Sequence, residues 1–501
     1  MKFNDNPIYP LSKKLLFTLF CSASVLFGCK KMLEIPLPVT RIAAEGAYST
    51  DRAAAATNNN VFGNLTNSLI FDGPLGIGLK TGLYTDELKN LNSLSTINNA
   101  YYTSTISSAD SGPTWTLFYG QLSNVNLSIE GLRASNTLKF KNQWLGEALF
   151  NRAFIHFYLV NLYGDVVIAN TSDFLVLKDL ARMPKADVYK QIIADLKEAE
   201  SLLANEYKNA AGATTTTNRA RPNKFAVKAM LAKVYLYVGD WINAEAMATE
   251  VIRESAVYKL LPPADIDKVF LAASQETIFA LQPIGTNFVR DYAAYSNNMP
   301  AILPAAAPPV AARTFESYVG VSLSQSMLDA FEKNPVTLLD DNRKTFWTRS
   351  AVKPANGTTP AETKYFPNKY KSSVAGAEFI VIMRLAEQYL IRAEARAMQS
   401  NFIGAKEDIN AIRNRAGLTG TSAENQSDLV KAVVNERRVE LFIENGHRLF
   451  DLRRTGLLDQ VMKQEILAKG TGFSWNTDRQ YWPIPVDDLF SGKNLIQTPG
   501  Y

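Results

Sequence analysis

The chain has 501 residues, enough for one large domain or two to three ordinary ones, and its 47% apolar content can fill a substantial core. The net charge is only +5, and no dense lysine and arginine run occurs outside one Arg/Glu-rich segment near the C-terminus, which argues against nucleic acid as a partner. The only cysteines are Cys21 and Cys29 and the only histidines are His156 and His447, so we expect a body without disulfides, thiol nucleophiles or cysteine-based metal sites.

The N-terminus is typical of an exported lipoprotein. Lys13 and Lys14 precede an apolar run at 15–27, which has the length of a signal-peptide core and is too short to span a membrane. A small residue stands directly before Cys29, whereas bulky Phe20 precedes Cys21, so Cys29 is the better lipid acceptor. A secreted protein with a chance cysteine is the alternative. We predict a signal peptide at 1–28, a lipid anchor at Cys29 and a tether at 29–42.

The next hundred residues alternate between helical and irregular patterns. Apolar spacing predicts helices over 43–67 and 115–132, the second with Trp115 and Tyr119 in the core. Between them, 72–111 is rich in Gly, Asn, Ser and Thr, which predicts an irregular loop with little core. Long irregular stretches often serve binding. The acidic pair Asp86-Glu87 in this loop is expected to form hydrogen bonds or a cap rather than a catalytic dyad.

The most strongly amphipathic helix is predicted at 143–163, where leucines and isoleucines form a sustained apolar stripe that Gly164 ends. His156 lies on it, and we expect a satisfied interior histidine rather than a ligand. A further helix is predicted to begin near Pro184. Small residues at 225–252, and more weakly at 378–417, have the spacing of tetratricopeptide hairpins. The predicted fold class is therefore mainly α, a tetratricopeptide-like hairpin scaffold with irregular loops and a few short β-strands inserted on one side.

Helical periodicity disappears between 275 and 323, where we expect a strand at 277–281 followed by a proline-rich insertion. Aromatic rings and amides alternate in this insertion, a mixture that suits sugars because a pyranose stacks on a ring while its hydroxyls bond to amides. The alternative is that the rings pin a long loop to the scaffold. The predicted stacking platform consists of Tyr101, Tyr102, Tyr292, Tyr295 and Tyr318.

The segment 435–456 combines an apolar helical face with an unusual set of charges. Gly446 is expected to end its helix as a left-handed C-cap. Glu436, Glu440 and Glu444 stack at i, i+4, an arrangement that is repulsive unless cations lie among them. Five arginines and no lysine are nearby, which predicts a buried network of two-pronged ion pairs that serves architecture. These arginines are Arg437, Arg438, Arg448, Arg453 and Arg454.

Four strings of the chain share one resemblance. They are WLGEALFNRAFIHFYLVNLYGDVVI at 144–168, IMRLAEQYLIRAEARA at 382–397, NERRVELFIENGHRLFDLRRTG at 435–456 and QYWPIPVDDL at 480–489. These strings resemble the SusD/RagB family of nutrient-binding lipoproteins. The family pattern also implies that Asp341 and Arg343 are structural. The resemblance implies an N-terminal SusD-like region at 43–270 and a C-terminal RagB/SusD region at 271–501, packed together as one globular unit.

By this resemblance, the protein faces the cell surface on the outer membrane, captures a nutrient, usually an oligosaccharide, and delivers it to a SusC-like TonB-dependent transporter. Peptide uptake within the same family is the first alternative, and a surface adhesion or assembly protein is the second. No catalytic motif is present, so we predict no enzyme, no cofactor and no metal. A glycosidase needs only two carboxylates, which one sequence does not exclude.

Overall fold

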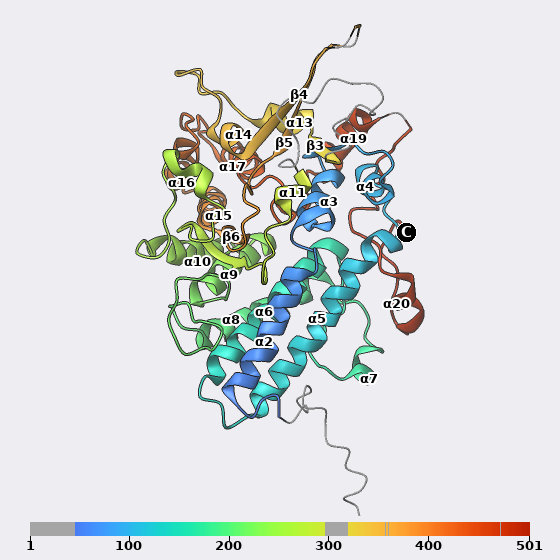
Figure 1. The fold of residues 1–501 in the computed structure, drawn as a ribbon, viewed down its shortest axis with the longest axis vertical. Helices are drawn as coiled ribbons and strands as arrows, with labels where there is room; N and C mark the ends of the chain where they lie inside the picture. Colours follow the sequence, from blue (N-terminus) through green and yellow to red (C-terminus); the bar gives the residue numbers. More distant parts are fainter. Residues whose placement is uncertain (1–45, 296–318, 356, 359, 471) are drawn as a thin grey trace, which may run out of the picture. The chain divides into compact units, whose positions relative to one another are not determined.

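The structure is a computed structural model and describes residues 46–295, 319–355, 357–358, 360–470 and 472–501. Residues 48–501 form one compact unit that consists mostly of helices with a few short strands (Figure 1). The predicted mainly α fold class is confirmed. The predicted signal peptide, the tether with Cys29, and Tyr318 lie outside the described residues. The boundary between 43–270 and 271–501 stays a prediction.

Four long helices form much of the N-terminal half of this unit. They are α2 (Asp51–Asn67), α5 (Ser108–Ala134), α6 (Lys141–Tyr163) and α8 (Lys185–Leu202). Helix α6 packs against the other three, and α2 and α5 run beside it in Figure 1. The helix predicted at 143–163 is confirmed. The prediction that only one of its faces is buried is wrong. Every residue of α6 from position 143 onward is buried because neighbours cover it on several sides.

Two helical hairpins occupy the segments with tetratricopeptide-like spacing. The first joins α9 (Lys224–Val238) to α10 (Trp241–Arg253), and the second joins α15 (Leu385–Met398) to α16 (Phe402–Arg415). Gly239 follows α9 with a φ of +77°, a left-handed conformation that glycine adopts without strain. Helix α10 packs directly against α15. The two hairpins, although distant in sequence, therefore belong to one helical stack.

Shorter helices connect these elements and lead to the C-terminus. They are η2 (Gly73–Leu75), α3 (Ile77–Tyr84), α4 (Thr96–Tyr102), α7 (Phe174–Leu177), η3 (Pro263–Lys268), α11 (Asp291–Tyr295), α13 (Gln325–Ala330), α14 (Asn342–Trp347), α17 (Gln426–Glu440), α18 (His447–Arg454), α19 (Leu458–Lys469) and α20 (Val486–Ser491). The prediction of an irregular 72–111 with little core is wrong, since this stretch contains α3 and α4. All residues of α3 are buried, because α4 and the start of α18 pack against it.

Six short strands pair as three antiparallel two-stranded sheets in the part of the chain that the structure describes. The pairs are β1 (Leu88–Asn90) with β3 (Val321–Leu323), β2 (Thr277–Leu281) with β6 (Ile380–Arg384), and β4 (Thr348–Lys353) with β5 (Glu362–Pro367). The strand predicted at 277–281 is confirmed. Both β2 and β6 are completely buried, and β6 leads directly into α15, so this sheet ties the central segment to the helical stack.

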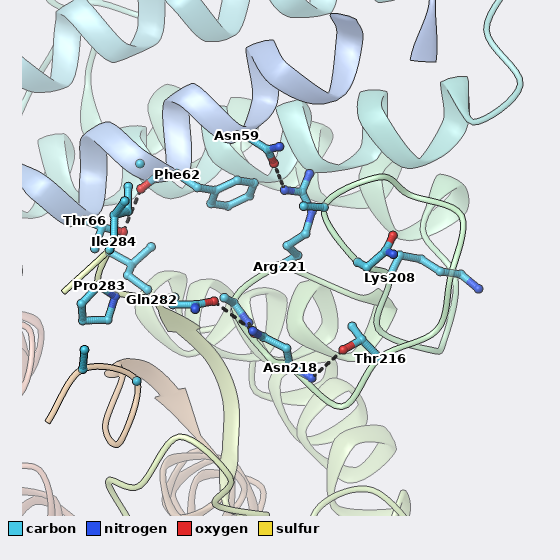
Figure 2. Close-up of a pocket in the computed structure, with 18 residues that line it drawn as sticks. Asn59, Phe62, Thr66, Lys208, Thr216, Asn218, Arg221, Gln282, Pro283 and Ile284 are labelled. Atoms are coloured by element: carbon cyan, nitrogen blue, oxygen red, sulfur yellow. Dashed lines mark hydrogen bonds between the residues drawn. The ribbon is translucent and has the colours of Figure 1, made fainter. Parts of the chain in front are cut away.

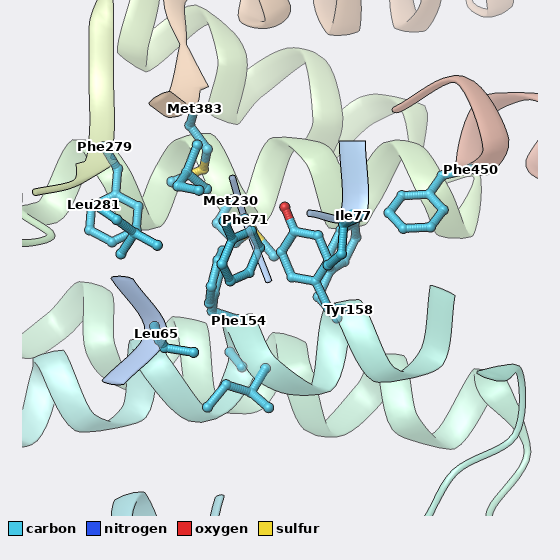
Figure 3. Close-up of a cluster of buried hydrophobic side chains, with 14 of the residues drawn as sticks. Leu65, Phe71, Ile77, Phe154, Tyr158, Met230, Phe279, Leu281, Met383 and Phe450 are labelled. Atoms are coloured by element: carbon cyan, nitrogen blue, oxygen red, sulfur yellow. The ribbon is translucent and has the colours of Figure 1, made fainter. Parts of the chain in front are cut away.

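One apolar core joins the two halves of the sequence. Figure 3 shows rings and aliphatic side chains from α6, β2, β6 and α18 meeting in a single cluster. Phe71 contacts Phe154 and Tyr158, with ring centroids 5.5 and 4.9 Å apart. Phe154 in turn meets Phe279 of β2 at 6.2 Å. Burial of such rings contributes about 2–3 kcal/mol each, so this cluster is a major source of cohesion between the halves.

Helix α17 ends at Glu440, earlier than its sequence pattern predicts. Gly446 has the expected left-handed φ of +83°, but it is the N-cap of α18 and not the C-cap of α17. In the turn between the two helices, Ile443 and Asn445 also have positive φ. Such a turn persists only when its surroundings hold it. The Glu87 carboxylate accepts a bond from Ile443 N at 3.0 Å, and the Asn445 amide donates to the Val381 carbonyl.

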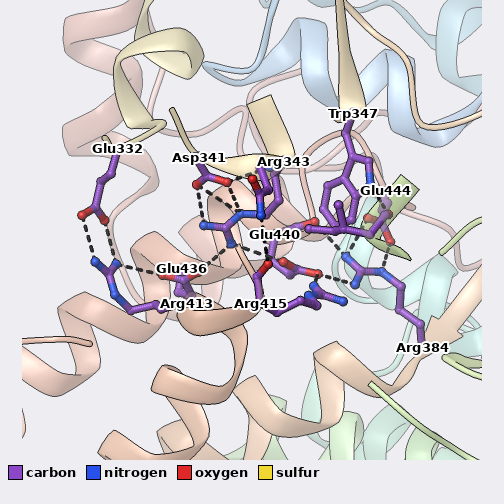
Figure 4. Close-up of polar contacts among 12 residues, drawn as sticks. Glu332, Asp341, Arg343, Trp347, Arg384, Arg413, Arg415, Glu436, Glu440 and Glu444 are labelled. Atoms are coloured by element: carbon purple, nitrogen blue, oxygen red, sulfur yellow. Dashed lines mark hydrogen bonds and ion pairs between the residues drawn. The ribbon is translucent and has the colours of Figure 1, made fainter. Parts of the chain in front are cut away.

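The three stacked glutamates do lie in a buried ion-pair network, shown in Figure 4. Arg384 Nε binds Glu444 at 2.9 Å, Arg343 Nη1 binds Glu440 at 3.2 Å, and Arg415 also binds Glu440. The network includes a lysine as well, because Lys369 Nζ binds Glu444. Burial alone would raise the pKa of Glu440, but the surrounding guanidinium groups hold it well below its usual range.

The arginines of the segment itself have other partners, so the prediction that they pair with the stacked glutamates is wrong. Arg437 binds Asp451 at 2.7 Å, and Arg454 binds both Asp451 and Glu394. Arg448 binds Asp86 on the far side of the sequence. Side chains on a helix point outward in all directions, so neighbours in sequence need not share partners. Asp341 and Arg343 are buried and pair at 2.7 Å, in agreement with a structural role.

Candidate functional site

A cavity of about 490 Å³ opens beside the C-terminal half of α2 and the end of β2 (Figure 2). Its walls come mainly from α2, from the connector 208–221 between α8 and α9, and from residues 282–285 after β2, and Ala375 and Gly376 complete them. The volume lies in the range of small-molecule sites. The lining includes Asn59, Phe62, Lys208, Asn218, Arg221 and Gln282.

Local structure explains why these three segments meet. Asn59, Phe62 and Thr66 are three to four positions apart on α2 and therefore share one face of the helix. Strand β2 is buried throughout, and Pro283 follows it, so the chain leaves the sheet and places exposed Gln282 at the rim. The backbone N–H of Ala280 in β2 donates to the Arg219 carbonyl at 3.1 Å, which holds the connector beside the strand.

Arg221 forms part of the cavity wall, and hydrogen bonds to Glu147 and Asn59 hold its guanidinium in place. Its Nε donates to Glu147 Oε1 at 2.9 Å, and its two terminal nitrogens bind Glu147 and the side-chain oxygen of Asn59. Glu147 is completely buried in α6 and pairs with the guanidinium, so the two charges balance. The guanidinium also lies 5.2 Å from the Phe62 ring centroid. This geometry fixes a planar donor group in the cavity wall.

A second cavity, of about 270 Å³, lies between α5, α7 and α20 and is more apolar. Trp115 and Tyr119 line it, but both also have structural partners. The Trp115 indole donates to Asp488, and the Tyr119 hydroxyl donates to the Val167 carbonyl at 3.0 Å. Trp115 is buried and Tyr119 half-buried against the main core, in agreement with the prediction that both belong to it.

The structure places most of the predicted stacking tyrosines inside the protein. Tyr101 is 1% exposed and donates its hydroxyl to the Asp110 carbonyl at 3.1 Å. Tyr102 is buried beneath the ammonium group of Lys469, 5.0 Å from the ring centroid. Tyr295 is 3% exposed. Tyr292 alone among the four described rings is half-buried, with its edge against Phe288.

The four described rings lie on two separate helices, and most of their surface is covered. Tyr101 and Tyr102 belong to α4, which packs on α3 and β1, while Tyr292 and Tyr295 belong to α11, which packs against η2. Burial of a large ring is favourable, so sequence position in a polar, irregular stretch did not keep these rings at the surface. A stacking role for the five tyrosines as a group stays a prediction, with Tyr318 outside the described residues.

The Asp86-Glu87 pair has structural partners, as predicted. Asp86 forms a two-pronged pair with Arg448 at 2.8 and 2.7 Å and also binds Arg438. Burial opposes its charge, but these guanidinium groups lower the pKa of Asp86 to about 2. Glu87 lacks such a partner, and burial raises the pKa of its carboxyl to about 7 despite the bond from Ile443 N.

We expect Glu87→Gln to stabilise the protein in a pH-dependent way. Because the folded-state pKa of Glu87 is raised, its contribution to stability is fully present below about pH 4.5 and is lost as the pH rises through 7. Glutamine keeps an acceptor for Ile443 N without the charge. Urea denaturation should therefore show a gain of about 1–3 kcal/mol at pH 8 and little change at pH 4.5. Glu424→Gln, at an exposed position, should show no such pH dependence, and equal behaviour of the two variants would contradict the assignment.

Within the described ranges, no group of three or more His, Cys, Asp or Glu side chains is placed to hold a metal ion. His156 is interior, as predicted: Nδ1 contacts the Arg152 carbonyl at 3.0 Å and Nε2 accepts from Ala169 N, while burial lowers its pKa to about 4. Among the helices that the structure describes, none is long and apolar enough to cross a bilayer.

Sequence reasoning missed the residues of the larger cavity. Asn59 is one of three consecutive asparagines, and Asn218 and Arg221 lie in a polar stretch between two predicted helices. Gln282 follows directly after the correctly predicted strand. That position was the one available signal, because polar residues at strand ends often form ligand sites. Nothing in the sequence links these positions, which meet only through the tertiary fold.

Two protein-family models match the chain. A model described as SusD family matches residues 341–501, and a model described as "Starch-binding associating with outer membrane" matches residues 80–236. One match falls in each half of the sequence. They contain several of the elements described above, among them α6 and α17.

Curated relatives extend over nearly the whole chain. SusD-like protein P2 of Formosa agariphila is 24% identical, over 98% of this chain and 100% of the relative. The starch-binding protein SusD of Bacteroides thetaiotaomicron is 34% identical, but only over 24% of this chain and 21% of the relative.

Solved structures show the same fold. A SusD superfamily protein from Bacteroides vulgatus superposes with a TM-score of 0.73 at 23% identity, covering 90% of this chain and 99% of the other. A laminarin-binding SusD-like protein superposes with a TM-score of 0.69 at 22% identity, covering 91% and 100%. These similarities establish the architecture.

Proposed function

Because this chain belongs to the SusD family, we propose that it is a carbohydrate-binding protein whose ligand occupies the cavity beside α2 and the end of β2. The observation that carries the proposal is the lining of that cavity. Side-chain amides and a fixed guanidinium alternate with the apolar surfaces of Phe62 and Ile284. Saccharides present hydroxyl groups around apolar C–H faces, and such a mixed lining complements both.

Relatives point in the same direction. One similar protein is named starch-binding and another laminarin-binding, and both names describe binding of a polysaccharide. The buried ion pairs of the C-terminal half support a binding role. The most prominent buried acids of the C-terminal half are held by arginines, and a carboxylate stabilised in this way is a poor proton donor or acceptor.

The proposal includes location and delivery. Lipidation of Cys29 would hold the protein at the outer membrane, with which one family description associates such proteins. From the cell surface, the protein would pass its ligand to a SusC-like TonB-dependent transporter. Recovery of a large outer-membrane barrel protein together with the tagged chain, from detergent-solubilised membranes, tests this partnership.

We expect Gln282→Ala to weaken glycan binding by about tenfold, because Gln282 is an exposed hydrogen-bonding group at the rim. Loss of one hydrogen bond to the ligand reduces the binding free energy by about 1–1.5 kcal/mol. Isothermal titration calorimetry against a panel of oligosaccharides and short peptides measures the effect. Thermal stability should not change, since the side chain is exposed.

Gln325→Ala is the matched control for this experiment. Gln325 is also an exposed glutamine, it lies outside the cavity, and its amide donates to Asp329. Its replacement should leave binding unchanged. Glycan binding that is insensitive to Gln282→Ala would place the site elsewhere, and binding of peptides alone would replace carbohydrate with peptide as the ligand class.

A further inference from the structure

The side-chain oxygen of each amide in the larger cavity already accepts a hydrogen bond from the protein itself. Asn59 Oδ1 accepts from Arg221, and Asn209 Oδ1 accepts from the backbone N–H of Ala211 at 3.1 Å. Asn218 Oδ1 accepts from Ala220 N at 2.8 Å. Gln282 Oε1 accepts from Asn218 Nδ2 at 2.9 Å, a bond visible across the cavity in Figure 2.

Chemistry fixes the orientation of these amides. A guanidinium and a backbone N–H can only donate, so the atom that faces each of them must be the amide oxygen. This settles Asn59, Asn209 and Asn218. Since the side-chain oxygen of Asn218 faces Ala220 N, its side-chain nitrogen faces Gln282. The Gln282 atom that accepts this bond must therefore be its side-chain oxygen. None of the four can be flipped without placing two donors or two acceptors against each other.

The groups left over are donors. Among the hydrogen bonds of the described residues, the amide N–H₂ groups of Asn59, Asn209 and Gln282 have no protein partner. The Lys208 ammonium group has only a long bond of 3.4 Å to the Thr215 hydroxyl. A ligand in this cavity therefore meets side chains that mainly donate hydrogen bonds.

The charged residues of the lining also favour a ligand that accepts hydrogen bonds. The described lining residues include Lys208 and Arg221 but neither aspartate nor glutamate. Arg221 is balanced by Glu147 beneath it, so Lys208 supplies an unbalanced positive charge at the cavity. A neutral sugar hydroxyl donates as well as accepts, and sites for neutral sugars gain from carboxylates and free amide oxygens. An anionic oxygen group only accepts hydrogen bonds, so it suits a lining whose free side-chain groups are mainly donors.

We propose that the carbohydrate bound in this cavity carries an anionic oxygen group, either a uronic-acid carboxylate or a sulfate ester. The inference rests on the proposed carbohydrate-binding function and adds a substrate class to it. The anionic group lies beside the amide N–H₂ groups of Asn209 and Gln282, and Lys208 adds positive charge from the edge of the lining, where its side chain points away from Gln282 (Figure 2). Backbone carbonyls of the rim receive the hydroxyl protons of the remaining sugar.

The test compares ligands that differ only in charge. Full-length protein in detergent is titrated with an oligogalacturonate and with its methyl ester, and separately with a sulfated oligosaccharide and its desulfated form. We expect at least one acidic form to bind about tenfold more tightly than its neutral partner at low salt, with a smaller difference at high salt. The pair that shows the preference identifies the source of the anionic group.

Variants then locate the effect. Lys208→Gln is expected to remove most of the preference for the acidic form while it leaves the binding of the neutral form nearly unchanged. Lys197→Gln, at an exposed lysine of α8 outside the cavity, should preserve the preference.

The outcomes separate the two proposals. Equal binding of acidic and neutral forms, with both weakened by Gln282→Ala, would overturn the anionic class and leave carbohydrate binding intact. A preference for the acidic form that survives Lys208→Gln would also overturn the inference, because the anionic group would then be bound elsewhere. Failure of every saccharide to bind would overturn both proposals.

Discussion

Arg384→Met is expected to lower the free energy of unfolding by about 3–5 kcal/mol, because it leaves buried carboxylates with too few cations. Arg384 is almost completely buried at the end of β6. Its guanidinium binds Glu276 at 3.0 Å and Glu444 at 2.9 Å, and it also binds Glu440. Methionine matches the length of the side chain but restores none of these bonds. Chemical denaturation followed by circular dichroism measures the loss.

Arg133→Met is the matched control for Arg384→Met. Arg133 pairs with Glu198 at 2.7 Å, a distance as short as those in the network, but both side chains are about half exposed. Water can replace the partner there, so the expected loss is below about 1 kcal/mol. Similar losses in the two variants would show that the buried network does not have the cohesive role assigned to it.

Gly78→Ala is expected to destabilise the protein by about 3 kcal/mol, because a methyl group at this position has no space. An ideal Cβ on Gly78 would lie 2.1 Å from the backbone oxygen of Ile443. That oxygen cannot move easily, since Glu87 and Asn445 fix the left-handed turn that contains it. The substitution therefore forces α3 away from the turn before α18, and thermal unfolding should report a lower midpoint.

Gly120→Ala provides a control with the opposite expected sign. Gly120 is exposed within α5, and no atom lies within 4 Å of a Cβ placed there. Alanine is the better helix former, so the expected change is a gain of about 0.5–1 kcal/mol. A mild effect of Gly78→Ala, comparable in size to that of Gly120→Ala, would contradict the close backbone contact.

The network and the turn have a common consequence for the proposed function. Together they fix β6 and the start of the C-terminal helices against β2, and β2 ends at the rim of the larger cavity. A site that relies on amides of set orientation needs such support, because each donor must remain in place to be useful. The stability variants therefore test the support of the cavity, and the binding variants test the side chains that line it.

The sequence by itself determined the elements whose signals are local. The apolar period of 143–163, the small residues of 225–252 and the apolar run at 277–281 each depend on residues a few positions apart, and all three elements are present. The structural roles of Asp341 and Arg343, implied by family resemblance, also hold. Periodicity and turn chemistry are sufficient for such features because chain neighbours alone create them.

Only the tertiary structure decided which distant residues became partners. The stacked glutamates are neutralised from positions 343, 384 and 415 rather than by the arginines beside them. The tyrosines of α4 were buried because α3 and β1 cover them, and the cavity formed from segments near 59, 218 and 282. The reason is physical: burial and pairing depend on what surrounds a side chain in space, and a linear pattern records only its neighbours along the chain.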